Sequence, residues 1–567
     1  MLQTTLATSF VPGTNLQADA IGANWSFLLP SLEPGNVLCL GRPPCAALRS
    51  LSRRASAVVV LCRDFRSLRA TAATARKYRL PNVLPIRVDP SRKLPLWQGR
   101  FDLAAISDRR LAQRLSRSRA LREELRRVLK PHGLIYCEVG HWAARPTAGR
   151  TLRKLSAHYP TFRPLWLTPT AGGELHTAVP LGDRETIDYF LHHRLDCPAI
   201  RRSPFRQLER LANACFRWDQ LVRRRAALLG HASNGTTDRP PQYLREIAGR
   251  AGIDLDGYRW GLSTPGKYMS RKVLFFLFDR TGTSPDYLVK LTRDPALNYR
   301  LENERVALEL LREMGFGDPA TVPRAAFFGR HAGLAVLGES AVRGVPFDRR
   351  TTFTADCPAA RAVIGRIIEL GEATAQRDAA TPSQIAEGLQ TLLDRFVRIY
   401  HVTQKQLSLL ESEIAAIAQC REPIPLVFQH GDPGAWNVLI TSRGEAALLD
   451  WEAAEPQGMP LWDLFYFLRS YAVRMARRTN TRNALKGFRQ CFLRESSLSP
   501  WVDAAVRQYC QRIELPRRLV GPLYYTCWMH RALKEATRLC EAGLQRGHYV
   551  SLLRSCLDRQ LGPFFVE

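Results

Sequence analysis

The sequence predicts an α/β domain followed by an α+β domain that is split into a small β-rich lobe and a large helical lobe. Two observations predict this order. Short apolar stretches alternate with helical stretches as far as Val139, which is typical of a parallel sheet covered on both faces. After strand-like stretches that end near Leu337, the pattern is helical almost throughout from Ala359 onward. We expect four segments: a first domain at 1-200, a basic helix and linker at 201-241, a small lobe at 242-340 and a helical lobe at 341-567.

The strands expected in the first domain are short and apolar: Asn36–Leu40, Ala57–Cys62, Val83–Val88, Phe101–Ile106 and Gly133–Val139. Helices are expected between them, over Ala46–Ser52, Phe65–Tyr78 and Leu121–Leu129. The amphipathic, basic stretch Arg201–Leu229 predicts a helix. His231–Pro241 follows as a linker, because it is polar and rich in Gly, Thr and Pro.

The first domain resembles a class I SAM-dependent methyltransferase of Rossmann-like fold. Asp64 closes the second strand, where such enzymes hold the ribose, and Asp89 follows the third strand. The turn after the first strand departs from the family, which has an acidic residue and a glycine-rich turn there. Pro43 and Pro44 occupy this loop instead, stiffen it and remove two amide donors. We therefore expect a degenerate scaffold in which SAM binding is doubtful.

Length and composition bound the class of protein. A chain of 567 residues is too long to fold around a single hydrophobic core, so two or three domains are expected. With 45% apolar and 24% charged residues the chain is globular, and its apolar runs are too short for a membrane span. The first twenty residues lack the pattern of a secretory signal, and the 13 scattered cysteines read as reduced thiols. We expect a cytoplasmic protein.

The formal net charge is +30, from 82 basic and 52 acidic residues. The electrostatic field of such a positive charge attracts polyanions such as nucleic acid or an anionic membrane. However, the arginines are dispersed among acids, and no motif of alternating aromatic and basic residues accompanies them. We expect no nucleic-acid partner, and the charge leaves peripheral contact with an anionic membrane open.

The most informative motif runs from His430 to Asn437 (HGDPGAWN) and is followed by Asp450-Trp451-Glu452. Phosphoryl transfer from ATP needs a carboxylate that orients the attacking hydroxyl and accepts its proton. It also needs an amide and a second carboxylate that hold Mg²⁺ on the phosphates. Asp432, Asn437 and Asp450 supply these three groups in this order.

The residues between Asn437 and Asp450 predict a hairpin, with strands at Val438–Thr441 and Ala446–Leu449. A turn centred on Arg443-Gly444 would place Asn437 opposite Asp450, so that two oxygen ligands share one cation. The alternative is an ordinary hairpin in which Asp432 and Asp450 serve only as turn or cap residues.

Three neighbouring residues are open to more than one interpretation. His430 is expected to brace the loop, because a neutral imidazole can hydrogen-bond backbone on both sides. Glu452 is either a ligand of a second metal or part of an exposed salt bridge. Asp463 is interpreted as structural, since it begins a helix next to the motif.

Phe428–Leu468 resembles the core of the aminoglycoside phosphotransferase and choline kinase-like family, relatives of protein kinases. The resemblance implies a bilobal fold, ATP and Mg²⁺ as cofactors, and a hydroxyl acceptor. Upstream, Lys290 ends a strand that resembles the family's ATP-phosphate strand, and Glu304 on the next helix is its implied partner, with Glu302 as the rival. The resemblance further implies that backbone groups of Gly338, Glu339 and Ala341 contact adenine, where the family connects its lobes.

We therefore predict an ATP- and Mg²⁺-dependent phosphotransferase that acts on a hydroxyl of a small molecule such as a sugar, an amino alcohol or a glycan unit. One alternative is a bifunctional methyltransferase-kinase, which an intact first domain would favour. Another is a non-catalytic nucleotide-binding scaffold, but a scaffold need not keep Asp432, Asn437 and Asp450 together.

Overall fold

The computed structural model describes residues 22–88, 94–106, 108–141, 146–159, 163–169, 175–191, 225–231, 239–265, 272–352, 354, 357–478, 484–492, 498–537, 539 and 541–558. The chain divides into two compact units. One, here called the sheet unit, contains Asp19–Leu301 and Ala326–Ala341, and the other, the helical unit, contains Glu302–Ala325 and Val342–Glu567. The division passes through helix α11 (Asn298–Glu313).

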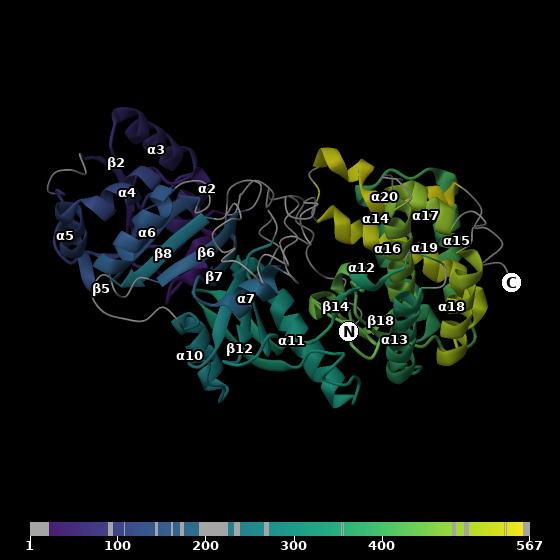
Figure 1. The fold of residues 1–567 in the computed structure, drawn as a ribbon. Coiled ribbons are helices and arrows are strands. Elements are labelled where there is room, and N and C mark those ends of the chain that lie inside the picture. The colour runs from purple at the N-terminus through teal and green to yellow at the C-terminus, as the bar shows by residue number, and fades with distance from the viewer. Residues whose placement is uncertain are drawn as a thin grey trace. The chain divides into compact units, whose positions relative to one another are not determined.

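The first part of the sheet unit is an α/β fold, as predicted (Figure 1). Its parallel strands are β1 (Asn36–Leu40), β2 (Ala57–Cys62), β3 (Val83–Arg87), β4 (Phe101–Ile106) and the start of β5 (Leu129–His141). Strands β1, β2 and β4 are buried along almost their whole length, because sheets covered on both faces need continuous apolar runs. The helices are α2 (Cys45–Arg54), α3 (Phe65–Lys77), α4 (Arg109–Arg117), α5 (Arg119–Val128) and α6 (Pro146–His158).

The sheet continues in antiparallel fashion beyond β5. Strand β8 (Arg225–His231) lies between β5 and β6 (Arg163–Pro169), and β6 pairs with β7 (Leu175–Pro180). The expected helix Arg201–Leu229 is therefore wrong at its end, while residues 201–224 lie outside the described residues. The segment RAALLGH is a short apolar run, and such a run fits a buried strand as well as one turn of an amphipathic helix.

The small lobe extends the same sheet. Its strands are β9 (Arg259–Ser263), β10 (Val273–Phe278), β11 (Tyr287–Leu291), β12 (Ala325–His331) and β13 (Leu334–Ser340), with helices α7 (Arg184–Tyr189) and α10 (Gln242–Arg250) nearby in the chain. Strand β7 pairs with β9 through Thr177 and Ala178, so that one sheet of thirteen strands runs through the sheet unit. Asn24 strengthens this connection, since its side chain bonds the Leu175 carbonyl and accepts a hydrogen bond from Arg293 at 2.6 Å.

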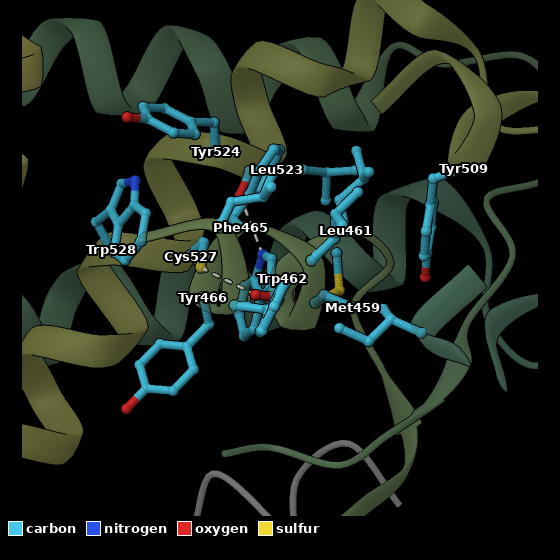
Figure 2. Close-up of a cluster of buried hydrophobic side chains, with 14 of the residues drawn as sticks. Met459, Leu461, Trp462, Phe465, Tyr466, Tyr509, Leu523, Tyr524, Cys527 and Trp528 are labelled. Atoms are coloured by element: carbon cyan, nitrogen blue, oxygen red, sulfur yellow. Dashed lines mark hydrogen bonds between the residues drawn. The ribbon is translucent and has the colours of Figure 1, made fainter. Parts of the chain in front are cut away.

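The helical unit is built mainly from helices, as Figure 1 shows for its green to yellow part. They are α12 (Phe347–Arg350), α13 (Pro358–Thr374), α14 (Pro382–Ile399), α15 (Gln404–Ala418), α16 (Trp462–Arg478), α17 (Ala484–Phe492), α18 (Ser499–Ile513), α19 (Val520–Ala536) and α20 (His548–Leu557). Capping boxes at Thr381 and Thr403 fix the starts of α14 and α15. An aromatic-rich core joins α16 to α19, where the Trp462 indole donates to the Leu523 carbonyl at 3.1 Å (Figure 2).

Short strands interrupt the helices of this unit and position the site. They are β14 (Val345–Pro346), β15 (Val427–Gln429), β16 (Val438–Ile440), β17 (Ala446–Leu448) and β18 (Glu455–Gly458). Strand β16 pairs with β14 and β17, and β15 pairs with β18. Among the described helices of the whole chain, none combines the length and apolar character needed to cross a lipid bilayer.

Candidate active site

His430 braces the loop between β15 and β16 from the inside, as expected. Its ring is fully buried, and Nε2 lies 3.0 Å from the Leu449 carbonyl while Nδ1 accepts the N–H of Asp432 at 3.2 Å. This pattern requires a neutral ring with its proton on Nε2. Burial lowers the pKa of His430, which keeps the ring neutral. The histidine thus ties the Asp432 backbone to the strand end that precedes Asp450.

Asp463, in the first turn of α16, holds the same loop from the other side. Its carboxylate accepts the backbone N–H of His430 at 2.6 Å and that of Gly431 at 3.1 Å. Burial raises the pKa of Asp463, while the charge of Arg531 and the two backbone donors favour its ionised form. Both interactions stabilise one loop conformation, which supports the structural interpretation of Asp463.

Gly431 is the residue on which this conformation depends most strictly. Its φ is +75°, in the left-handed region, and an added Cβ would lie 1.9 Å from the Ala453 carbonyl oxygen. Only glycine fits where two backbone segments approach this closely.

Asn437 is turned toward Asp432 through its amide nitrogen. Nδ2 donates to the Asp432 carbonyl at 3.0 Å and to its carboxylate at 3.2 Å. The amide oxygen of Asn437 is consequently left for another electropositive partner. The side chain is nearly buried, whereas Asp432 is only half-buried and can reach a substrate.

The hairpin is one residue out of the expected register. Val438 pairs with Leu448, and the Leu449 N–H donates to the Asn437 carbonyl at 2.8 Å, so Asn437 lies opposite Leu449 rather than Asp450. The expected turn centred on Arg443-Gly444 is wrong because three residues, with Gly444 at a φ of +83°, close the loop between Thr441 and Glu445.

Asp450 follows the paired residues and takes a left-handed conformation of its own, with φ +71°. The next residue, Trp451, is fully buried, and its backbone N–H donates to the Glu304 carboxylate at 2.9 Å. Asn303 also binds the carbonyls of Glu452 and Ala454 at 3.1 and 3.0 Å. Helix α11 therefore fixes the loop that carries Asp450.

The donor set offered by Asn437 and Asp450 is an amide oxygen and a carboxylate, which are hard ligands suited to Mg²⁺. Among the described residues no three His, Cys, Asp or Glu side chains converge on one point. Such a pair still fits Mg²⁺, because this ion keeps several waters and is usually completed by substrate phosphates.

In the sheet unit, Lys290 lies on β11 and is almost fully buried. Its Nζ is 2.8 Å from the carboxylate of Glu339, which is also buried, on the neighbouring strand β13. The sequence did not suggest this pair, because Glu339 falls after the apolar run that marks the strand. A buried ammonium needs such a counter-charge, and it holds the lysine side chain in one orientation.

Gly338 and Glu339 lie within β13, so the expected end of this strand at Leu337 is wrong. The strand continues to Ser340 because Gly338 leaves room for the ring of Phe327, where a Cβ would be 2.3 Å away, and because Lys290 neutralises Glu339. The Ala341 N–H donates to the Asp286 carbonyl at 2.8 Å.

One face of α16 lines the loop that carries Asp432, and the sequence predicted only part of this face. Asp463, Tyr466 and Ser470 are spaced three and four residues apart, so they share this face. Ser470 accepts the Ala435 N–H at 3.0 Å, and Tyr466 packs edge-on against Trp436 with ring centres 6.0 Å apart. The helical spacing from Asp463 was the available signal for both residues.

A second candidate site is a cavity of about 730 Å³ at the carboxyl ends of β1, β2 and β4. Its wall includes Pro43, Pro44 and Asp64. Asp64 accepts the Ser67 N–H at 2.7 Å and thereby caps α3. At the start of α2, Gly22 packs so closely that a Cβ would lie 2.0 Å from the backbone of Ala46. Asp89 lies outside the described residues.

Comparison with known proteins gives one family match and several similar structures. The model of the phosphotransferase enzyme family matches residues 274–498. Aminoglycoside phosphotransferase APH(3'')-Id from Streptomyces rimosus is 16% identical over 50% of this chain and 94% of its own, with a TM-score of 0.29. The bifunctional kinase-methyltransferase WbdD is 14% identical over 85% of this chain and 84% of its own, with a TM-score of 0.22.

A SAM dependent methyltransferase from Aquifex aeolicus is 20% identical over 23% of this chain, with a TM-score of 0.18. This chain spans 64% of the length of that protein. None of the curated proteins matches the chain.

Proposed function

We propose, from the premise that residues 274–498 are a domain of the phosphotransferase enzyme family, that the protein transfers a phosphoryl group from ATP to a hydroxyl of a small molecule. The observation that carries the proposal is the fixed position of Asp432. His430 and Asp463 hold its loop from two sides, and Asn437 binds both its carbonyl and its carboxylate. Such rigidity is what positioning a nucleophile requires.

Each proposed residue has one task. Asp432 orients the acceptor hydroxyl and takes its proton as the new oxygen–phosphorus bond forms and the bond from the γ-phosphorus to the β-phosphate oxygen breaks, which releases ADP. Asn437 and Asp450 hold Mg²⁺, which when bound would neutralise charge on the phosphates. Lys290, held by Glu339, contacts the phosphates of the nucleotide, and Glu304 remains the partner that the resemblance implies. Backbone groups of Gly338, Glu339 and Ala341 remain the predicted contacts of adenine.

The test is an acceptor screen with purified protein, ATP and Mg²⁺ that follows ADP release. An acceptor-dependent rate in the wild type, lost in Asp432→Ala, supports the proposal. Absence of Mg²⁺-dependent ATP binding would contradict it whatever the acceptor.

The alternative, a bifunctional protein whose first domain methylates, is favoured by the cavity beside Asp64. The residues present do not fit SAM, because Pro43 and Pro44 lack amide donors and Gly22 covers the backbone at Ala46. We therefore propose a phosphotransferase whose first domain does not use SAM.

A further inference from the structure

Arg531, on α19 of the helical unit, is a buried cation close to the proposed base. Its side chain is 6% exposed, and its guanidinium lies 3.6 Å from the centre of the Tyr466 ring. No carboxylate of the described residues lies within 4 Å of it, and its Nε has no hydrogen-bond acceptor there. A buried charge in this state is costly unless something else binds it.

Arg531 belongs to a group of side chains that gather at the face of α16 turned to the loop of Asp432. We call Trp436, Tyr466, Arg469, Arg531 and Tyr549 the acceptor-side group. Trp436 lies in the loop that carries Asp432 and packs on Tyr466, over which Arg531 lies, so these contacts connect the group to the loop of the proposed base. The Asp432 charge also raises the pKa of both Tyr466 and Arg531. Figure 2 shows the Tyr466 hydroxyl directed away from the apolar cluster that its ring borders.

The group offers hydrogen-bond donors in excess of acceptors. The Tyr549 hydroxyl donates to that of Tyr466 at 3.2 Å, so the Tyr466 proton is left for another acceptor. Burial and the Asp432 charge raise the pKa of Tyr466, which keeps this proton on the oxygen. Arg469 stacks over Tyr549 at 5.1 Å, and its own Nε also lacks an acceptor among the described residues.

Trp436 adds an apolar surface to these donors. Its ring is 50% exposed although it lies in the loop next to Asp432, and Arg474 stacks on it at 5.5 Å. Gly434 permits this position, since a Cβ there would be 2.3 Å from the indole. An exposed ring beside donors is typical of a binding surface for a partly apolar, partly charged molecule.

From these observations we infer that the acceptor is a hydroxyl compound that also carries an oxyanion, a phosphate or a carboxylate, and that Arg531 and Tyr466 bind it. This inference rests on the proposed phosphotransferase function. A guanidinium and a phenol match an oxyanion in charge and in hydrogen-bond geometry. An ammonium group would instead meet two buried arginines, so cationic acceptors are disfavoured.

A purely electrostatic role is the competing explanation, in which Arg531 only balances the charges of Asp432 and Asp463. The two roles differ in what they change. Loss of a counter-charge to the base would lower kcat for every acceptor equally. Loss of oxyanion binding would raise KM for anionic acceptors alone.

The first experiment compares matched acceptors at saturating Mg-ATP: glycerol 3-phosphate and glucose 6-phosphate, glycerate and glucuronate, glycerol and glucose, ethanolamine and glucosamine. We expect turnover of phosphorylated or carboxylated compounds, and the two sets tell which oxyanion is preferred. Arg531→Gln should raise KM for the preferred anionic acceptor at least about tenfold, and Arg531→Lys should restore part of the loss. Turnover restricted to neutral or cationic compounds, or an unchanged KM in Arg531→Gln, would overturn the inference.

Arg366→Gln is the matched control. Arg366 also stacks on an aromatic ring, that of Phe316 at 4.4 Å, and also has a buried Nε without an acceptor among the described residues. Its terminal nitrogens, however, already bind Thr321 at 2.7 Å and Glu369 at 3.0 Å. Its replacement should leave the KM of every acceptor unchanged.

A second measurement decides the case in which no acceptor is turned over. Inorganic phosphate is titrated calorimetrically into protein saturated with a non-hydrolysable ATP analogue and Mg²⁺. Phosphate should bind to the wild type and to Arg366→Gln and should be lost in Arg531→Gln. Equal phosphate binding by all three proteins, or by none, contradicts the inference, whereas failure of the analogue itself to bind contradicts the proposed function.

Discussion

The carboxylate of Asp463 accepts the backbone N–H of His430 at 2.6 Å, so a helix start and a catalytic loop that are far apart in sequence are fixed to each other. The same histidine uses both ring nitrogens on backbone partners at either end of the hairpin. Loop, hairpin and helix therefore form one rigid frame, and this frame holds the half-buried carboxylate of Asp432.

Asp432→Ala should lower phosphoryl transfer by about 10²-fold or more, because a positioned base contributes on this scale. Calorimetry should find Mg-ATP binding close to that of the wild type, since the residue is not a proposed ligand of the nucleotide. Equal turnover of mutant and wild type would remove Asp432 from the mechanism.

Asp450→Asn should abolish Mg²⁺-dependent ATP binding, because the anionic member of the donor pair is lost. The side chain keeps its size, so the fold should survive, which circular dichroism can check. Unchanged affinity for Mg-ATP would contradict the assignment of Asp450 as a metal ligand.

Gly431→Ala should destabilise the helical unit by roughly 3 kcal/mol or more, through left-handed strain and the clash with the Ala453 carbonyl. Gly444→Ala is the control, since Gly444 is also left-handed but has open space around it. It should cost only the strain, about 1–2 kcal/mol. Urea unfolding of both variants measures the difference, and equal losses would show that the close approach at Gly431 is unimportant.

SAM should not bind with a micromolar dissociation constant, because Pro43 and Pro44 lack amide donors and Gly22 packs against the backbone of Ala46. The titration needs the full chain, because a fragment that ends near residue 200 lacks β8, the strand between β5 and β6. Micromolar binding would favour the bifunctional alternative.

Stability should decline as the pH falls below about 6.5, because His530 is half-buried and neutral. Burial, together with the charges of Lys534 and Arg531, lowers the pKa of His530 well below its usual 6.5. Between these two pKa values the imidazole is protonated in the unfolded chain and neutral in the folded chain. Lowering the pH therefore favours unfolding. Burial also lowers the pKa of His430, so this histidine contributes to the same loss of stability at low pH. Urea unfolding at pH 7.5 and 5.5 should show a smaller loss in His530→Gln than in the wild type.

Much of the fold could be predicted because local and tertiary requirements agree. Strands β1, β2 and β4 match the expected ranges, since buried parallel strands need nearly continuous apolar runs. The bracing of the loop around Asp432 could also be predicted, because His430, Gly431 and Asp432 are adjacent in sequence and their partners follow at short spacing.

The remainder depends on contacts that a single sequence does not display. The register of the hairpin depends on whether two or three residues form its turn. The left-handed conformation of Gly444 produces the three-residue turn. The pairing of Lys290 with Glu339 follows from the register of β11 and β13. Arg531, distant from the motif in sequence, joined it only through the packing of α16 against α19.

The pairing of β7 with β9 has a consequence for how the chain is made. A protein emerges from the ribosome from its N-terminus, at roughly 5–20 residues per second. Strands β6 and β7 leave the ribosome before β8, which must insert beside β6, and before β9, which must cover the edge of β7. Until Ser263 has been synthesised, that edge is open and able to pair with another nascent chain. The first domain and the small lobe should therefore complete their folding together, and a premature stop between β8 and β9 should yield an aggregating product rather than a functional half.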